Sequence, residues 1–477
     1  MSGAGKDGRR DPHGETPEPI PATLTADELD AAEIPDSEMG GGASGPMVGS
    51  FAATAGIQVM QAVTGVLLAR VLGPSGRGEL AAVILWPTVL TVVGSLGLAQ
   101  ASTYFIARAR SVGEEGRLVG TALALTAAIS TVLVAIGLII VPLALGGYEP
   151  EVVDTARKFL VAFIPINLFA VITMSLLNGQ HRFALFQTVR ILVIAAILVG
   201  LVGLDLAGEL TIESGAAAYV VAYAIGGAIG GFAILRSVRG RIGVAVEQAR
   251  ELLGFGLRSA LSQSMWSLNE RADQLVISIF FSAASLGLYV VAVTLTSLTT
   301  LIGFSFAVIV LPMIARFDSI EERRRVAHLF ITATLVCATV VSVPIFVLEP
   351  QLIRFFFGAD FVDAAGVGRV LLVAGIVFGL NRVMESILQA VGRPLESSIG
   401  EGVALAVTAA GLAVLLPTMG IMGAGVTSLI AYTASSAFMI HRAARALEVR
   451  PLDLVKPERE MLAKARGLIG SLRRSAR

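Results

Sequence analysis

The chain has 477 residues, of which 55% are hydrophobic and only 15% are charged, and its formal net charge at pH 7 is zero. Its mean hydropathy of +0.78 excludes an ordinary soluble domain. Because a membrane-crossing helix needs about 20 predominantly apolar residues, runs of this kind favour an all-α protein embedded in a bilayer.

The first 45 residues are rich in Pro, Gly, Asp and Glu. Such a composition predicts a disordered acidic tail, and its simplest role is to be solvated. No apolar core of a signal peptide follows the basic residues near its start, so we expect the first hydrophobic segment to be retained.

Twelve apolar segments follow the tail, and each is long enough to cross a bilayer. They are predicted at 46–69, 80–106, 118–146, 159–177, 184–206, 215–235, 253–281, 285–313, 326–348, 366–390, 395–416 and 422–441. We therefore expect two lobes of six helices. The predicted divisions of the chain are a tail at 1–45, lobes at 46–235 and 253–441, a linker at 236–252 and a basic tail at 442–477.

Lys and Arg concentrate in alternate loops, as around Arg236 and Arg323, and in the C-terminal tail. By the positive-inside rule this distribution predicts that both termini are cytoplasmic. The basic tail is expected either to rest on anionic lipid headgroups or simply to anchor the topology.

Nothing in the chain has the pattern of a catalytic or metal site. Cys337 lies in an apolar run, and the four histidines have no ligand spacing. No P-loop, nucleophile elbow or HExxH motif occurs. We therefore predict a carrier without cofactor or metal rather than an enzyme, and we expect no nucleic-acid partner.

The second half of the chain repeats the first. The segment Leu72–Leu80 parallels Phe281–Tyr289, with Gly78 matching Gly287 at an offset of 209. Two further pairs share an offset of 211, namely Ser175 with Ser386 and Arg182 with Arg393. Since six spans is an even number, both halves enter the membrane from the same side and form a parallel repeat.

The first span of each half carries polar residues on one helical face. Thr54, Gln58 and Gln61 match Gln263, Ser267 and Glu270 at the same offset of 209. Unsatisfied polar groups are costly in lipid, so these two stripes must face protein or water. They are expected either to line a cavity between the halves or to hydrogen-bond neighbouring helices.

Three runs resemble those of the polysaccharide flippase branch of the multidrug, oligosaccharidyl-lipid and polysaccharide exporter superfamily. They are LARVLGPSGRGEL at Leu68–Leu80, Arg271-Ala-Asp273, and SLGLYVVA at Ser285–Ala292. The resemblance implies a V-shaped pair of six-helix lobes that moves an undecaprenyl-pyrophosphate-linked oligosaccharide across the bacterial cytoplasmic membrane by alternating access. Membrane lipids, polysaccharide polymerases and glycosyltransferases are its expected partners. The acidic tail is not part of the pattern.

Ionisable residues inside spans are candidates for function because burying them is costly. Arg271 is expected to bind the pyrophosphate, since a guanidinium donates two parallel hydrogen bonds at any working pH. The alternative is a structural ion pair with Asp273 or Glu270.

Six charged residues have candidate roles in ion coupling or gating. Arg382 and Glu385 are three residues apart and are expected to neutralise each other. Arg190 and Glu401 are equivalent under the repeat, and they are expected either to pair across a cytoplasmic gate or, for Arg190, to reach the interface. Glu270, Asp273 and Glu401 are candidates for binding a coupling proton or sodium ion.

Three other functions remain open at this stage. A flippase for the peptidoglycan precursor and a cation-coupled drug exporter belong to the same superfamily, and the resemblance does not fix the sugar. Gln58 and Gln61 stand in a span with no basic residue before Arg70, whereas the peptidoglycan group tends to place arginines there. A scaffold that recruits envelope enzymes through its charged tails is the alternative of another class.

Overall fold

The computed structural model describes residues 44–238 and 240–456, without the side chains of 44–53, 259 and 261–263. The described residues form α-helices and one short 3-10 helix, with no strand among them. Contacts group the chain from Phe51 onward into one unit. The predicted all-α class is confirmed.

The helices of the first half follow one another through short links. They are α2 (Ser44–Gly94), α3 (Leu98–Arg108), α4 (Val112–Ala144), α5 (Pro150–Gly179), α6 (Phe183–Leu206) and α7 (Ile212–Ser237). Those of the second half are α8 (Val246–Phe280), α9 (Ala283–Ala315), α10 (Ile320–Phe356), η2 (Ala359–Ala364), α11 (Ala365–Ala390), α12 (Pro394–Met419), α13 (Ile421–Ala446) and α14 (Pro451–Val455).

Helix α2 contains two of the predicted spans. Its backbone leaves helical geometry at Gly73, where φ is 66°, and Pro74 follows. Glycine tolerates this conformation because it has no Cβ. The bend separates the first span from the second, and α3 completes the second span after a break at Leu96 and Gly97.

By length and apolar composition, ten of the described helices are able to cross a membrane. Two adjustments reconcile this number with the twelve predicted spans. Helix α2 counts once although it contains two spans. Helix α8 is not among the ten, although its 35 residues exceed the length that a span needs. The two-lobe membrane fold with about twelve spans is therefore confirmed.

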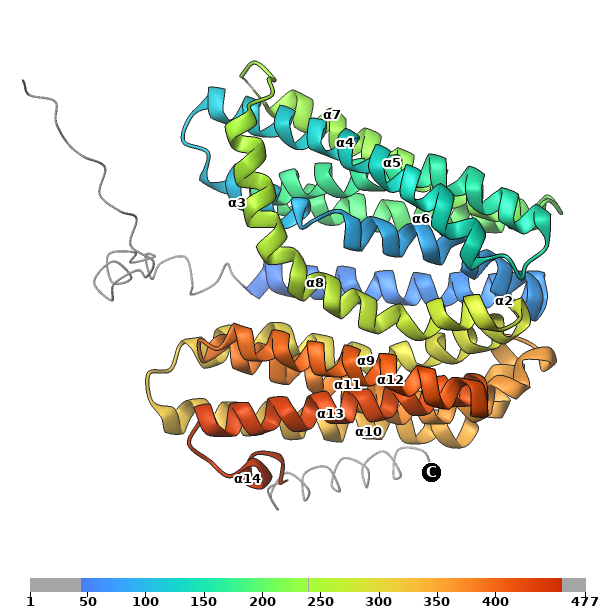
Figure 1. Ribbon diagram of the computed structural model, residues 1–477. Helices are drawn as coiled ribbons and strands as arrows, with labels where there is room; N and C mark the ends of the chain where they lie inside the picture. Colours follow the sequence, from blue (N-terminus) through green and yellow to red (C-terminus); the bar gives the residue numbers. More distant parts are fainter. Residues whose placement is uncertain (1–43, 239, 457–477) are drawn as a thin grey trace, which may run out of the picture. The chain divides into compact units, whose positions relative to one another are not determined.

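Contacts between the helices define the two lobes (Figure 1). Helices α3 to α7 contact one another, and helices α9 to α13 do the same. Helix α8 touches both sets, because it contacts α3 and α4 as well as α9, α12 and α13. It therefore connects the lobes both along the chain and in space.

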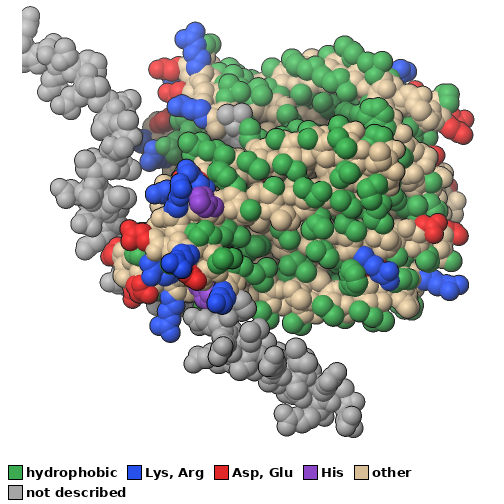
Figure 2. All heavy atoms as spheres, turned by 60° about the horizontal axis from the view of Figure 1, so that its bottom comes forward, with side chains coloured by type: hydrophobic (Ala, Val, Ile, Leu, Met, Phe, Trp, Pro, Cys, Tyr) green, Lys and Arg blue, Asp and Glu red, His purple; other side chains and the backbone are tan. Residues whose placement is uncertain are grey.

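The links between helices lie at two ends of this bundle, which we call the basic end and the opposite end. The basic end carries the α7–α8 link and α14, whereas the opposite end carries the bend at Gly73, the α4–α5 link and η2. Figure 2 shows charged and His side chains gathered where the helices end, and hydrophobic side chains covering the middle of the visible face. This distribution matches a helical bundle whose middle lies in lipid.

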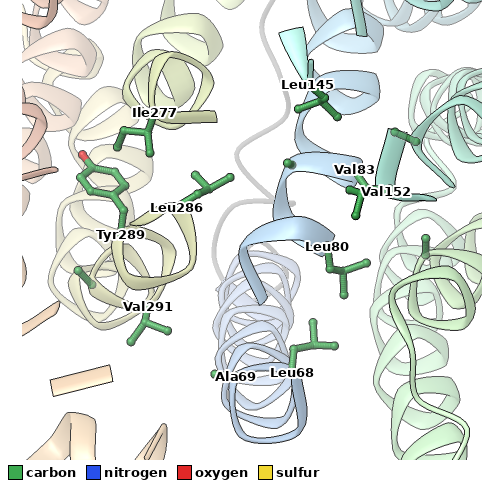
Figure 3. Close-up of a cluster of buried hydrophobic side chains, with 14 of the residues drawn as sticks. Leu68, Ala69, Leu80, Val83, Leu145, Val152, Ile277, Leu286, Tyr289 and Val291 are labelled. Atoms are coloured by element: carbon green, nitrogen blue, oxygen red, sulfur yellow. The ribbon is translucent and has the colours of Figure 1, made fainter. Parts of the chain in front are cut away.

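The lobes meet at the opposite end through their backbones. A methyl group on Gly78 would overlap the carbonyl oxygen of Ala283, and one on Gly287 would overlap that of Pro74. The two contacts are equivalent under the predicted offset of 209, so the repeat seen in the sequence is also a symmetry of this contact. Apolar side chains of both halves, including Leu68 and Tyr289, form one buried cluster around it (Figure 3).

Some helices run past the predicted divisions of the chain. The linker predicted at 236–252 contains the first turns of α8, which begins at Val246. The tail predicted from 442 begins later, because α13 continues to Ala446 and both Leu447 and Leu454 are buried in the second lobe. Residues 1–43 and 457–477 lie outside the described part. They include all of the acidic tail predicted at 1–45 except its last two residues, which begin α2.

Candidate functional site

Arg382 of α11 is the centre of a buried ion cluster. Its Nη1 lies 2.7 Å from Glu385 Oε2, one helical turn away, and its Nη2 pairs with Glu401 of α12. Arg382 is 6% exposed and Glu401 is 3% exposed. The predicted pairing of Arg382 with Glu385 is present, and Glu401 adds a second carboxylate from the neighbouring helix.

A pocket of about 530 Å³ opens beside this cluster. It lies between the lobes, because Gln100 belongs to α3 whereas the other lining residues belong to α8, α9 and α11. Its polar lining is Gln100, Arg382, Glu385, Ser386 and Gln389, and its aromatic and aliphatic lining is Trp266, Phe304, Ala307, Val308 and Leu311. A mainly apolar wall with a few polar groups is typical of a ligand site.

Two hydrogen-bond donors of the lining residues have no partner in the part of the chain that the structure describes. They are Trp266 Nε1 and Arg382 Nε, and both are buried. The Arg382 guanidinium also lies 5.7 Å from the Trp266 ring centre and 5.1 Å from that of Phe378. Because an unpaired buried donor is costly, the pocket favours a ligand that brings acceptor oxygens.

A second polar network holds α8 to the helices of its own lobe. Asp273 accepts hydrogen bonds from Tyr289 of α9 and from Ser428 of α13, the latter at 3.5 Å. Asn269 accepts one from Thr408 of α12 at 3.0 Å. Asp273 is therefore held by hydroxyl groups and makes no ion pair with any described residue.

Arg271 is half-buried, and among the described residues it makes no ion pair with Asp273 or Glu270. Its charge acts instead on Tyr223 of α7, in the other lobe. The structural alternative, an ion pair on α8, is not present in this conformation. Among the described residues, the charge of Arg271 is therefore not compensated by an ion pair with a carboxylate on its own helix.

The remaining candidates are distributed over several places. Gln58 is half-buried, Gln61 is exposed and Ser267 is buried. Gln263 lies in α8, but its side chain is outside the described ones. Arg190 donates to Gln187 and lies over Phe186, while Glu401 is bound by Arg382, so these two residues are not paired in this structure.

Sequence reasoning missed the aromatic wall of the pocket and Gln100. Trp266 precedes Ser267 of the predicted stripe, and that adjacency was the available signal. Phe304 and Gln100 gave none, because an aromatic residue or a single amide in a span is usually a packing residue. A groove between α5 and α7, lined by residues such as Pro165, Phe169 and Gly227, carries no charged side chain.

This fold and the interlobe pocket define the class: a multi-pass membrane protein of two helical lobes with a pocket between them. The sequence profile described as "Polysaccharide biosynthesis protein" matches residues 49–318, which is more than half of the chain. The chain therefore belongs to that family. No curated protein matches the sequence.

Solved structures show the same fold at low sequence identity. A structure described as lipid II flippase MurJ in an inward closed conformation matches with a TM-score of 0.71 and 17% identity, over 85% of this chain and 89% of that one. An inward-facing MATE family transporter matches with a TM-score of 0.68 and 16% identity, over 82% and 96%. An outward-facing MATE family transporter matches with a TM-score of 0.57 and 15% identity, over 87% of this chain and 95% of that one.

Proposed function

We propose that the protein is a flippase that moves an undecaprenyl-pyrophosphate-linked oligosaccharide across the bacterial cytoplasmic membrane. The observation that carries this proposal is the pocket between the lobes, with a mixed aromatic and polar lining and unpaired donors on Trp266 and Arg382. Sugars present apolar C–H faces and many hydroxyl oxygens, which suit aromatic rings and amide or carboxylate side chains respectively. Membership of the polysaccharide biosynthesis family supports the same substrate class.

The basic end faces the cytoplasm in this proposal, with both termini inside. The excess of Lys and Arg in the links at that end supports the orientation. The lobes touch at the opposite end through Gly78 and Gly287, so the conformation closes the outer side. The higher similarity to the inward-facing than to the outward-facing MATE structure agrees with this assignment.

Arg271 is the proposed ligand of the pyrophosphate. Arg382 is already bound by two carboxylates, whereas Arg271 is half-buried without an ion pair among the described residues. A guanidinium without a fixed carboxylate partner keeps its donors for a phosphate that leaves water. Gln58 and Gln61 on α2 and Ser267 on α8 are proposed to contact the sugar, with Gln263.

The test measures transport by the protein reconstituted in vesicles. The probe is a fluorescent undecaprenyl-pyrophosphate-linked N-acetylhexosamine, and its protection from an impermeant quencher reports translocation. Losing a charge-assisted contact to a partly buried phosphate should cost about 1.5–3 kcal/mol, so Arg271→Ala should lower affinity roughly tenfold to a hundredfold. Arg271→Lys should recover only part of the lost affinity, because lysine lacks the planar guanidinium that donates two parallel hydrogen bonds.

Arg258→Ala is the matched control, since Arg258 lies on the same helix and is exposed. Transport should be expressed per monodisperse molecule, so that loss of folded protein is not counted as loss of transport. Normal transport by folded Arg271→Ala would remove Arg271 from the headgroup site. Efflux of a lipophilic cationic dye without any movement of lipid-linked sugars would favour the drug-exporter alternative.

The peptidoglycan precursor is the nearest competing substrate, because the MurJ structure shares the fold. The same assay with the peptidoglycan lipid precursor as the probe separates the two. The scaffold alternative predicts that function resides in the charged tails. Removing residues 1–40 and the residues after Lys456 should then abolish function, whereas a carrier should keep its transport.

A further inference from the structure

Glu349 is a buried carboxylate to which the proposed function gives no role. It lies on α10 near the opposite end of the bundle, and its exposed fraction is 0%. Neither of its carboxylate oxygens has a hydrogen-bond partner within the described ranges. A charged carboxylate in such a place would be very unfavourable, so burial without a partner favours the neutral, protonated form.

The neighbouring helix is shaped to receive this side chain. Glu349 Oε1 lies directly against Gly368 of α11, where a methyl group would overlap it. Any residue larger than glycine at position 368 would displace the carboxyl group. The carboxyl group can therefore occupy this position against Gly368 only while α10 and α11 are packed together.

The guanidinium of Arg369 is the nearby cation, but it is bound to other groups. Pro350 follows Glu349 and has no backbone N–H, so the carbonyl oxygen of Phe346 is left without its helical donor. Arg369 Nε donates to that oxygen at 3.3 Å, and the guanidinium lies 5.6 Å from the Phe346 ring centre. Arg369 is thus held by the backbone and an aromatic ring instead of by the carboxylate.

Among the residues that the structure describes, the other ionisable groups near this end do not pair with Glu349. The positive charge of Arg369 interacts electrostatically with Glu349. Arg354 on α10 and the carboxylates Asp360 and Asp363 of η2 are exposed to solvent. On α9 the ionisable side chain is Tyr289, which donates to Asp273, while Arg70 of α2 donates to the carbonyl oxygens of Phe355 and Phe356.

We propose that Glu349 is a proton-binding site of the carrier. It is protonated while it is seated against Gly368, and it releases its proton to water when the opposite end opens. The carboxylate then pairs with Arg369, which leaves the Phe346 carbonyl. The proton-loaded form favours the conformation with the opposite end closed, and the ionised form favours its opening.

The test needs no transported substrate, so its failure is distinguishable from failure of the flippase proposal. Spin labels at Gly147 and Met419, in a Cys337→Ser background, report the separation of the two lobes at the opposite end. We expect the short distance at low pH and a growing long-distance population as pH rises. Glu349→Gln, which mimics the neutral acid with nearly the same shape, should keep the short distance at every pH.

Two further variants sharpen the result. Arg369→Gln removes the partner of the ionised carboxylate, so the opening transition should move upward by about one pH unit, a tenfold change in proton affinity. Infrared pH-difference spectra should show a protonated carboxyl band that Glu349→Gln lacks. Glu79→Gln, a half-buried carboxyl at the same end, is the control and should leave that band in place.

A pH-dependent distance that persists unchanged in Glu349→Gln would overturn the proposal, and so would a lobe distance that does not respond to pH in the unmodified protein. A carboxyl band that survives in Glu349→Gln would assign the protonated acid to another residue and would overturn it as well.

Discussion

At the scale of single residues, Arg382 shows how a charge is held inside a span. Its two carboxylate partners, Glu385 and Glu401, come from its own helix and the next one. Removing one partner of a buried ion pair leaves the other charge without compensation, which costs far more than the pair contributes. The cluster therefore constrains substitution at every member.

We predict that Arg382→Met destabilises the protein by about 3–5 kcal/mol, because Glu401 is left charged and buried. Adding Glu401→Gln to the same chain should restore most of that loss by removing the stranded charge. Thermal unfolding in detergent, followed by circular dichroism, measures both variants. A double variant no more stable than Arg382→Met alone would mean that the arginine contributes mainly through its packing on Trp266 and Phe378.

Sequence reasoning identified Arg382, Glu385 and Glu401 as ionisable residues in spans but not the way they combine. The spacing of three residues predicts the contact of Arg382 with Glu385. Glu401 lies on a different helix, and the repeat pairs it in sequence with Arg190 and not with Arg382. Which helix faces which is decided by tertiary packing, and a single sequence does not contain that information.

At the scale of helices, the meeting of α2 and α9 depends on glycine in both. Since Gly78 and Gly287 each lie against a backbone carbonyl of the other lobe, a side chain at either position forces the helices apart. The sequence predicted the repeat around these glycines, but not their contact. The two separate spans predicted from the sequence are present, because the backbone of α2 leaves helical geometry at Gly73 between them.

We predict that Gly78→Ala opens the opposite end. A backbone clash of this kind costs about 1–3 kcal/mol, so the closed population should fall roughly fivefold to a hundredfold. Spin-label distances between Gly147 and Met419 measure the change. Gly56→Ala on the same helix has open space around it and should leave the distances unaltered; a Gly78→Ala distribution identical to that of Gly56→Ala would argue against the contact.

The C-terminal helices define where the chain tolerates truncation. Leu447 and Leu454 are buried against the second lobe, and Arg324 of α10 donates to the carbonyl oxygen of Leu447. A stop after Lys456 should therefore leave stability unchanged, whereas a stop after Arg445 should lower the thermal midpoint in detergent, because each buried leucine contributes about 1.5–3 kcal/mol. Equal midpoints for the two truncations would show that this segment does not stabilise the lobe.

At the scale of the whole molecule, the predicted topology rests on the charged links. We expect a cysteine at Gly147 to react with an impermeant thiol reagent from outside the cell, and one at Val244 to react only after the membrane is opened, both in a Cys337→Ser background. Both positions lie in links between helices. The reverse pattern would place the basic end outside and would contradict the positive-inside assignment.

Much of the architecture followed from apolar run lengths and the internal repeat, which are properties of the linear sequence. The pocket could not be predicted from these properties, because Gln100, Trp266 and Phe304 come from three helices that belong to both lobes. Glu349 was also missed, because it stands one residue beyond the span predicted at 326–348 and its isolation is visible only once α11 is in place.

The contact between Gly78 and Gly287 has a further consequence for the origin of the chain. Each half offers the same glycine and the same carbonyl to the other, as in the isologous interface of a twofold dimer. A single six-helix half thus already carries both surfaces that the contact requires. Two identical six-helix chains, inserted in the same orientation, would meet through this patch, and joining them into one chain would need no new interface.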